Sequence, residues 1–277
     1  MTEICEILAT FEASDAEELL INGTRSMGFL YGENHKVAPS PYSDQATLMS
    51  VAQEFALNQH QRLDPKKPSA GGYITIKDIR WHFVIPPAAP EGPVLSFRKH
   101  QMQKLNRHNF PSLEGKEHIL TEALHRFCPI LICGETGSGK TSFLHFLLRE
   151  SSLNKRVLIL EDLAEIPLTG PLWCRLLTRD ADTTGFGAIN MRELFVQSLR
   201  LRPDRLVFGE IRSNEMEFYL KSYYAGHQGS LATVHAHDKE SLLRRYRDLI
   251  FLSNKKTLCA VFMTRGSPPE IRSITYI

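Results

Sequence analysis

From Ser112 to the end of the chain, short apolar runs alternate with segments whose hydrophobic residues recur at helical spacing. Strands of a parallel sheet are continuous apolar runs because helices cover both faces of such a sheet. The pattern therefore predicts an α/β domain. We expect strands at 129–133, 156–161, 172–177, 205–209 and 230–235, helices at 113–127, 140–150, 190–201, 214–225 and 239–250, and a closing hairpin from 258–263 and 271–277.

Residues 1–98 have shorter segments, several with period-two alternation, and predict a smaller mixed α/β domain. The dipeptide Asn22-Gly23 favours a tight turn between two strands. The expected elements are strands at 18–21, 27–31, 73–76, 79–85 and 94–98, and a helix opened by Ser43 that carries Leu48, Val51, Phe55 and Leu57.

The segment 99–111 between these regions is predicted to be a linker, because it has few apolar residues and several cations and ends at Pro111. This basic segment is either a solvated hinge, or its cations approach a bound nucleotide or an anionic membrane. The expected organisation is an N-terminal domain at 1–98, a linker at 99–111 and an α/β domain at 112–277.

Composition excludes several classes of protein. Among 277 residues, 42% are hydrophobic and 23% charged, as in ordinary globular domains. A net charge of +2 gives no basic field, so no direct contact with nucleic acid is expected. The apolar runs are far shorter than the ~20 residues of a membrane span, and the first residues do not form a signal peptide. Five cysteines without a metal-binding spacing indicate reduced thiols of a cytoplasmic protein.

The most specific motif is a phosphate-binding loop (P-loop), which follows the apolar run 129–133 and precedes an amphipathic helix. Its backbone N–H groups would form an anion nest, Lys140 would reach the β- and γ-phosphates, and the Thr141 hydroxyl would bind Mg²⁺. The motif predicts a site for ATP and Mg²⁺. Its residues are Gly134, Glu135, Thr136, Gly137, Ser138, Gly139, Lys140, Thr141 and the following Ser142.

Two later apolar strands end in acids, at Glu161-Asp162, with Glu165 beyond, and at Glu210, with Arg212 beyond. Carboxyl ends of parallel strands meet at the ligand-binding edge of such a sheet. Spacing favours Glu161 as the group that polarises the attacking water and Glu210 as the group that holds the Mg²⁺ hydration shell, although the reverse assignment stays open. A histidine-containing stretch supplies His235, placed to sense the γ-phosphate, and His227, which is equally well explained as structural.

Taken together, these stretches resemble the secretion ATPase superfamily of type II and type IV secretion and type IV pilus motors. The resemblance is carried by four motifs: the P-loop, the acidic segment 159–165, the segment 199–212 and the histidine segment 226–236. Within the superfamily the chain is most similar to Flp/Tad pilus assembly ATPases (CpaF-type) and the related conjugation and type IV secretion ATPases. Short N-terminal stretches also match: 20–23, 62–64, 84–87 and 95–99.

The resemblance implies a RecA-like P-loop ATPase domain that forms a hexameric ring, with ATP between the two domains. It maps phosphate-reaching arginines onto Arg98 and then Arg80, and further family arginines, of the nucleotide site or the ring interface, onto Arg175 and Arg179. It also places Arg212 in the nucleotide site. The expected partners are inner-membrane platform proteins of a pilus or secretion system, and the expected location is cytoplasmic, peripheral to the inner membrane.

Departures from the family pattern are Ala225, Ser213-Asn214 and a shortened stretch at 252–256, and the chain stops at a closing strand. The predicted function is Mg²⁺-dependent ATP hydrolysis that powers Flp/Tad-like pilus assembly or type II/IV secretion. The alternatives are a conjugation-type transfer ATPase, a nucleic-acid translocase with the same core, and an assembly factor that binds ATP with little hydrolysis.

Overall fold

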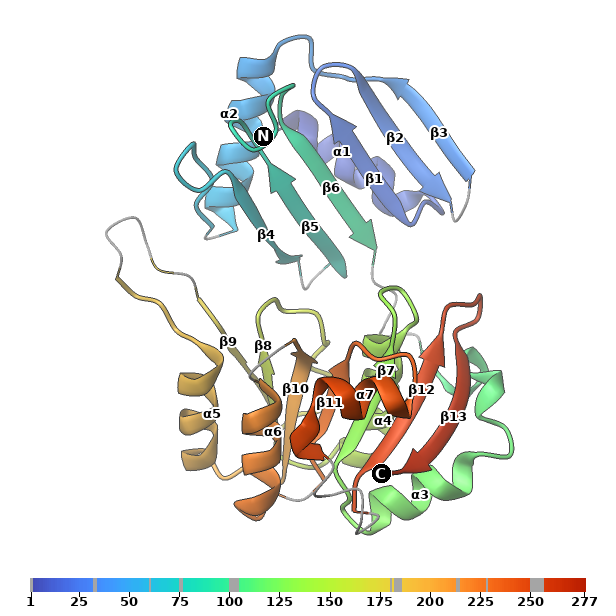
Figure 1. Ribbon diagram of the computed structural model, residues 1–277. Coiled ribbons are helices and arrows are strands. Elements are labelled where there is room, and N and C mark those ends of the chain that lie inside the picture. Colours follow the sequence, from blue (N-terminus) through green and yellow to red (C-terminus); the bar gives the residue numbers. More distant parts are fainter. Residues whose placement is uncertain are drawn as a thin grey trace. The chain divides into compact units, whose positions relative to one another are not determined.

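The computed structural model describes residues 2–31, 34–59, 61–74, 77–99, 105–179, 181, 186–212, 215–227, 229–249 and 257–277. The chain divides into two compact units, Met1–Gln101 and Met102–Ile277. Each unit has its own sheet and its own buried core, as expected of a domain (Figure 1).

The second unit is built on a seven-stranded sheet in the order β13-β12-β7-β11-β10-β8-β9. All neighbouring strands are parallel except β13, which runs antiparallel to β12. The predicted parallel sheet with a closing hairpin is therefore confirmed. The strands are β7 (Ile130–Gly134), β8 (Val157–Glu161), β9 (Trp173–Leu177), β10 (Arg205–Ile211), β11 (Leu231–Val234), β12 (Cys259–Thr264) and β13 (Glu270–Tyr276).

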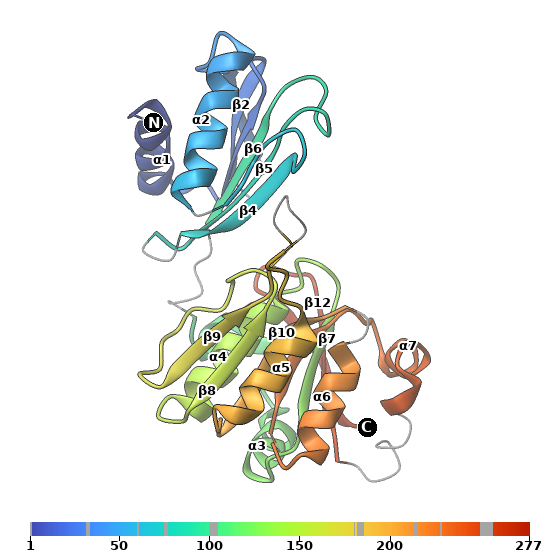
Figure 2. The same ribbon diagram turned by 90° about the vertical axis from the view of Figure 1, so that its left-hand side faces the viewer.

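Helices cover both faces of this sheet, as Figures 1 and 2 show. Alternate residues of one strand enter different cores: Leu131 and Cys133 face one core, and Ile130 and Ile132 face the other. Both faces of β7 are thus buried, which explains its uninterrupted apolar sequence. The Ile130 face packs against α3 (Glu117–His125) and α4 (Lys140–Ser152), and the Leu131 face against α5 (Met191–Arg200), α6 (Glu215–Tyr224) and α7 (Lys239–Arg245).

Several boundaries differ from the predicted ones. The helix predicted at 113–127 begins at Glu117, after a 3₁₀ turn at Pro111–Leu113. α7 ends at Arg245, and another 3₁₀ turn follows at Arg247–Leu249. β10 continues to Ile211, so Glu210 lies inside the strand rather than after it.

The first unit has an antiparallel six-stranded sheet in the order β3-β2-β1-β6-β5-β4. The helices α1 (Thr2–Ala13) and α2 (Gln45–Asn58) lie on one face of it (Figure 2). The turn at Asn22-Gly23 is confirmed, with Gly23 at φ 60°. The strands are β1 (Glu18–Asn22), β2 (Ser26–Tyr31), β3 (Asn34–Pro39), β4 (Ser69–Ile74), β5 (Ile79–Val84) and β6 (Val94–Lys99).

The sequence patterns did not predict α1 and β3. All six residues of β3 are exposed, so no alternation marks it, and it exists as an edge strand paired with β2. In α1, by contrast, Ile4, Leu8 and Phe11 are buried and do have helical spacing. α2 starts at Gln45 because Asp44, not Ser43, is the N-cap.

The face of this sheet away from the helices presents Arg80 and Arg98. Arg80 on β5 pairs in register with Arg98 on β6, while their neighbours Trp81 and Phe97 enter the core. Both arginines therefore belong to one row of side chains on the open face, since side chains alternate along a strand.

Part of the predicted linker belongs to the second unit. Residues 100–104 lie outside the described residues, but Phe110 is fully buried between Phe143 and Phe146, and Leu105 accepts a hydrogen bond from Arg149 (3.0 Å). We therefore propose a linker that ends before Leu105.

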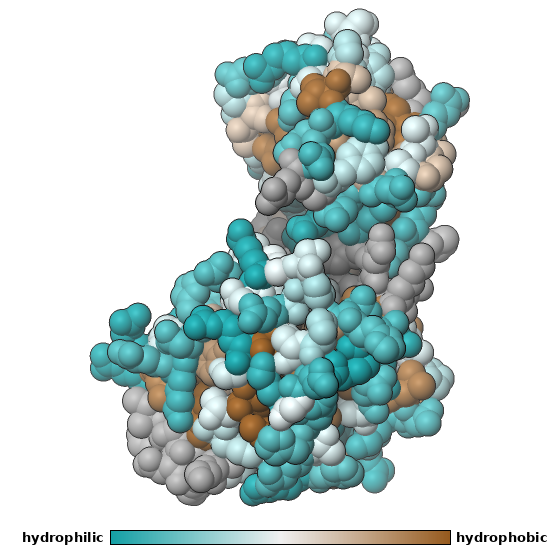
Figure 3. Space-filling model, turned by 90° about the vertical axis from the view of Figure 1, so that its right-hand side faces the viewer, coloured by the Kyte–Doolittle hydropathy of each residue, from teal (hydrophilic) through white to brown (hydrophobic). Residues whose placement is uncertain are grey.

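In the described part of the chain, no helix has the length and apolarity needed to cross a membrane. The face seen in Figure 3 is mainly hydrophilic, and its hydrophobic residues form small separate patches. Such patches are usual on protein surfaces.

Candidate nucleotide site

The P-loop connects β7 to α4, in the strand–loop–helix arrangement that the motif requires. Gly137 and Gly139 have φ of 79° and 80°, in the left-handed region that favours glycine, and Gly139 is the N-cap of α4. The backbone N–H groups at the start of α4 are thus available to an anion. The predicted local structure of this loop is confirmed.

Lys140 is held inside the loop. Its Nζ donates a hydrogen bond to the carbonyl of Glu135 (2.7 Å), and the residue is only 7% exposed. Burial lowers the pKa of Lys140, and the nearby carboxylate of Glu210 opposes that shift most strongly. The ammonium group therefore lies within the curve of the loop, where phosphates bind in P-loop proteins.

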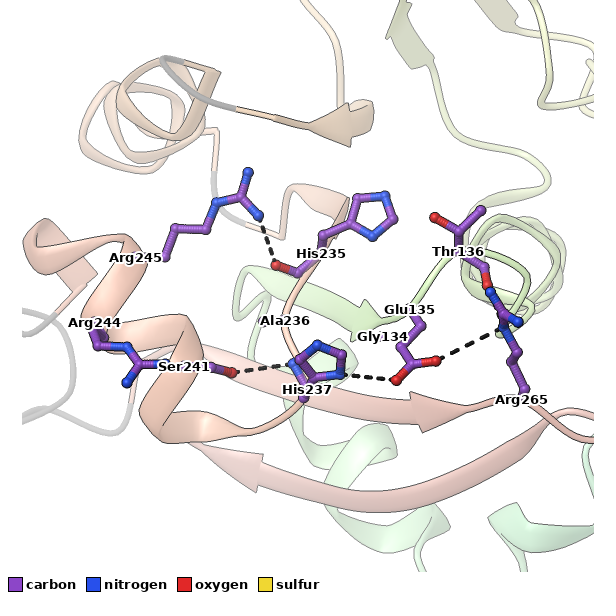
Figure 4. A pocket seen from close by; sticks show the side chains of 10 residues that line it. All are labelled: Gly134, Glu135, Thr136, His235, Ala236, His237, Ser241, Arg244, Arg245 and Arg265. Atoms are coloured by element: carbon purple, nitrogen blue, oxygen red, sulfur yellow. Dashed lines mark hydrogen bonds and ion pairs between the residues drawn. The ribbon is translucent and has the colours of Figure 1, made fainter.

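A cavity of about 530 Å³ adjoins the outer side of the loop (Figure 4). Arg265 donates from Nε to the carbonyl of Thr136 (2.7 Å). The carboxylate of Glu135 lies 3.2 Å from His237 Nδ1 and 3.8 Å from Arg265 Nε. The cavity is lined by Gly134, Glu135, Thr136, His235, Ala236, His237, Ser241, Arg244, Arg245 and Arg265.

Among these lining residues, the sequence patterns did not single out Ser241, Arg244, Arg245 and Arg265. The pairing of Met263 with Gly134 carries the end of β12 to the P-loop. A closing hairpin was predicted, but not the strand beside which it lies, so the approach of Arg265 to the loop could not be foreseen.

Glu161 is buried and fully engaged. It is 3% exposed, and its Oε2 accepts a hydrogen bond from Arg175 Nε (2.7 Å). Its Oε1 accepts from the N–H groups of Glu165 (3.1 Å) and Ile166 (3.0 Å). Burial raises the pKa of Glu161, although Arg175 opposes the shift. Gly209 permits this packing, because a Cβ there would lie 2.8 Å from Glu161 Cγ.

Glu210 has more open surroundings. Its Oε1 lies 2.8 Å from His235 Nε2 and its Oε2 lies 2.5 Å from Arg212 Nε, while 28% of its side chain is exposed. Burial alone would raise the pKa of Glu210, but the contacts with Arg212 and His235 outweigh it and lower the pKa. Glu210 therefore contacts Arg212 and His235 directly, its charge acts on the pKa of Lys140, and its carboxylate is ionised at neutral pH.

The loop that follows β8 faces the same region. Asp162 accepts from Thr178 Oγ1 (2.8 Å) and lies 3.6 Å from Arg212 Nη1. The charge of Glu165 acts on the pKa of both Lys140 and Arg212. Glu165 thus joins the site, although the sequence patterns did not assign it a role.

Comparison with known proteins agrees with this geometry. A family model described as "Type II/IV secretion system protein" matches residues 50–263. The chain belongs to this family. A putative conjugal transfer protein of Mycobacterium tuberculosis (strain H37Rv) is 31% identical over 238 residues, which are 82% of this chain and 67% of the relative. VirB11, a type IV secretion system protein of Bartonella quintana, is 25% identical over 274 residues (85% and 76%).

Solved structures support the fold of this member of the type II/IV secretion family. The pilus retraction motor PilT, solved with bound ADP, has a TM-score of 0.61 at 16% identity, covering 94% of this chain and 78% of that chain. The ATPase DotB of Legionella pneumophila has a TM-score of 0.60 at 15% identity, covering 95% and 76%. The predicted α/β, RecA-like fold class and the predicted superfamily are both confirmed.

Two predicted site residues lie in unexpected places. His227 precedes β11, at the opposite end of the strand from His235, and its N–H bonds the carbonyl of Ser222 (2.9 Å). Because β11 runs parallel to β7, His227 lies at the edge of the sheet away from the P-loop, so the nucleotide-binding assignment within this unit is wrong.

Arg175, predicted for the nucleotide site or the ring interface, is only 12% exposed. Its guanidinium bonds Glu161 and the carbonyl of Ile166 inside the unit. The structure therefore corrects the predicted role of Arg175: its guanidinium binds groups within the second unit. Arg179, four residues on, is exposed beside Gly187, and its role remains a prediction.

Arg80 and Arg98 belong to the first unit, and their approach to the nucleotide remains a prediction. A dedicated metal cage is likewise not found, since no group of three or more His, Cys, Asp or Glu side chains in the described residues could hold a metal. Mg²⁺ in P-loop proteins needs no such cage, because phosphates and waters supply most of its ligands.

Proposed function

We propose that this chain hydrolyses ATP and uses the energy to drive export or fibre assembly in a type II/IV secretion or type IV pilus system. The observation that carries the proposal is the contact of the ionised Glu210 with His235 (2.8 Å), close enough to Lys140 of the P-loop for the charge of Glu210 to act on the pKa of that lysine. The relatives named for conjugal transfer and VirB11 favour a transfer or secretion system over Flp/Tad pilus assembly, which stays the alternative.

In this proposal, the P-loop N–H groups and Lys140 bind the β- and γ-phosphates. The residues present fit Mg²⁺, because Thr141 follows Lys140 in the first turn of α4 and Glu210 is an ionised carboxylate whose charge acts on Lys140. Thr141 would supply a direct ligand, and Glu210 would bind the hydration shell. Mg²⁺ would neutralise charge that develops on the phosphate oxygens.

We propose Glu165 as the acid that orients the attacking water. The oxygens of Glu161 are engaged by Arg175 and by two backbone N–H groups, one of which belongs to Glu165. Glu161 would therefore position the loop, and Glu165, whose charge acts on Lys140, would face the phosphates. His235 would hold the carboxylate of Glu210 in place.

We further propose a homo-hexamer, with Arg98 and Arg80 closing over the nucleotide. The chain would work in the cytoplasm, bound peripherally at the inner membrane to platform proteins of its system. These finer assignments rest on the family resemblance. Molecular mass in solution, measured with and without Mg-ATP, tests the ring: a monomer at all concentrations under both conditions would contradict it.

The test of the activity is phosphate release by wild type and Lys140→Ala, with Lys155→Ala as control. Lys155 lies beyond the other end of α4, so its loss should leave the rate unchanged. Lys140→Ala should reduce release to background, because it removes the cation that binds the β- and γ-phosphates. Tight ATP binding by a wild type without any release would instead indicate a nucleotide-dependent assembly factor.

A further inference from the structure

The pairing of β10 with β11 is interrupted where β10 carries Glu210. Phe208 pairs with Ala232, but the next pair joins Ile211 to Val234, so β10 has one more residue than its partner. This is a β-bulge, a feature that often aims a side chain beside an active site. Backbone groups at a bulge lose regular partners and need others when they are buried.

Side chains of β11 and of the segment after it satisfy these carbonyls. Thr233 Oγ1 donates to the carbonyl of Gly209 (2.6 Å), and the Tyr246 hydroxyl donates to that of Ile211 (3.4 Å). Arg245 donates from Nη2 to the carbonyl of Arg212 (2.6 Å) and from Nη1 to that of His235 (3.1 Å). Arg245 is therefore a bridge between the end of β10 and the residue that follows β11.

α7 presents Arg245 from a well-fixed position. Asp238 caps the helix through the N–H of Ser241 (2.7 Å), and Leu242 is fully buried in the core below. The Arg245 guanidinium also lies over the Tyr246 ring, 5.3 Å from its centroid. Figure 4 shows it directed at His235, whereas the neighbouring Arg244 points elsewhere.

We propose that Arg245 is a positioning residue for hydrolysis: by joining the ends of β10 and β11, it keeps Glu210 in contact with His235 and turned toward the P-loop. The inference rests on the proposed ATPase function. It assigns Arg245 no contact with phosphate, because its two shortest contacts go to backbone carbonyls. Glu210 would be correctly oriented for hydrolysis only while Arg245 keeps both of these hydrogen bonds.

The test compares Arg245→Ala, Arg245→Lys and the control Arg247→Ala in the full chain. Arg247 is an exposed arginine of the following 3₁₀ turn and does not line the cavity. Arg245→Ala should lower kcat about tenfold or more, because small misplacements of reacting groups cost up to ~10²-fold. KM and the Kd for ATP should change less than about twofold, since the P-loop is intact.

Two readouts separate positioning from general damage. Free guanidinium ion, far below denaturing concentrations, should restore part of kcat to Arg245→Ala, whereas Arg245→Lys should recover little because an ammonium lacks the planar two-sided fork. In Arg245→Ala, amide hydrogen exchange should be faster than in wild type at residues 209–212 and 235–237, and unchanged in α4. A lowered thermal midpoint with unchanged kcat, or a kcat equal to that of wild type, would overturn the inference.

A rise of the Kd for ATP with kcat preserved would also overturn it, by making Arg245 a phosphate contact. If the proposed ATPase function is wrong, wild type and Arg247→Ala would both release no phosphate. Faster amide exchange at 209–212 in Arg245→Ala would then still show that Arg245 holds the end of β10.

Discussion

Glu161 and Glu210 each end an apolar run in the sequence, yet the fold gives them different surroundings. Glu161 is enclosed by Arg175 and two backbone N–H groups, whereas Glu210 is more exposed and contacts Arg212 and His235. A carboxylate whose oxygens are engaged in this way holds structure more readily than it polarises water. At the scale of residues, we therefore propose separate tasks for the two acids.

This difference predicts the behaviour of the Glu161–Arg175 pair. Glu161→Gln and Arg175→Ala should each lower the free energy of unfolding by about 3–5 kcal/mol, because each leaves a buried partner without its counter-ion. Both should also slow hydrolysis, since the 162–166 loop loses its anchor. Urea unfolding and phosphate release measure the two effects.

The double variant discriminates between the roles. If the two side chains act as one unit, the double variant Glu161→Gln, Arg175→Ala should lose little more unfolding free energy and activity than either single variant. Additive losses of activity, or a Glu161→Gln variant as stable as wild type and inactive, would instead support Glu161 as the group that polarises water.

At the scale of elements, the bulge in β10 decides where Glu210 points. β10 and β11 would pair regularly without the extra residue, and successive side chains of a strand face opposite sides. A one-residue change of register would thus move Glu210 to the other face of the sheet. The hydroxyl of Thr233, 2.6 Å from the Gly209 carbonyl and 1% exposed, helps to hold this irregular segment.

Thr233→Val tests the element. The shape is nearly conserved, but the half-buried Gly209 carbonyl loses its hydrogen-bond partner, which should cost about 1 kcal/mol of unfolding free energy. The value of kcat should fall while the Kd for ATP is kept. Thr233→Ser, which retains the hydroxyl, is the control and should stay close to wild type; equal losses in both variants would assign the effect to the methyl group.

At the scale of the whole molecule, two units must cooperate if the proposed motor is correct. Each has a separate core, and Arg80 and Arg98 lie on the face of the first sheet that its own helices leave open. In many P-loop enzymes, the arginine that stabilises the transition-state charge is supplied by another domain or another protein.

Arg98→Ala should therefore lower kcat strongly, by up to ~10³-fold if it acts as an arginine finger. Arg25→Ala is a matched control: Arg25 belongs to the same unit but lies in the β1–β2 turn, at the other end of β1 from Arg98. Steady-state phosphate release by the full chain measures both. Equal rates for Arg98→Ala and wild type would remove Arg98 from the site.

Local patterns of the sequence were sufficient for the P-loop, the parallel sheet with its hairpin and most helices of the second unit. Their signals are contained within short windows: glycine positions, apolar runs and helical spacing. In α1 the spacing of Ile4, Leu8 and Phe11 was also present and could have been used. β3 had no local signal, because an exposed edge strand is defined by its partner.

What the tertiary structure alone decided is which side chains meet. The order of strands places the end of β12 and the following Arg265 beside the P-loop, encloses Glu161 with Arg175, and puts His227 at the far edge from His235. Contacts of this kind join residues far apart in the chain, and their energies depend on burial and geometry. The sequence by itself therefore determined most of the elements and the phosphate-binding loop, while packing decided the surroundings of each charged residue.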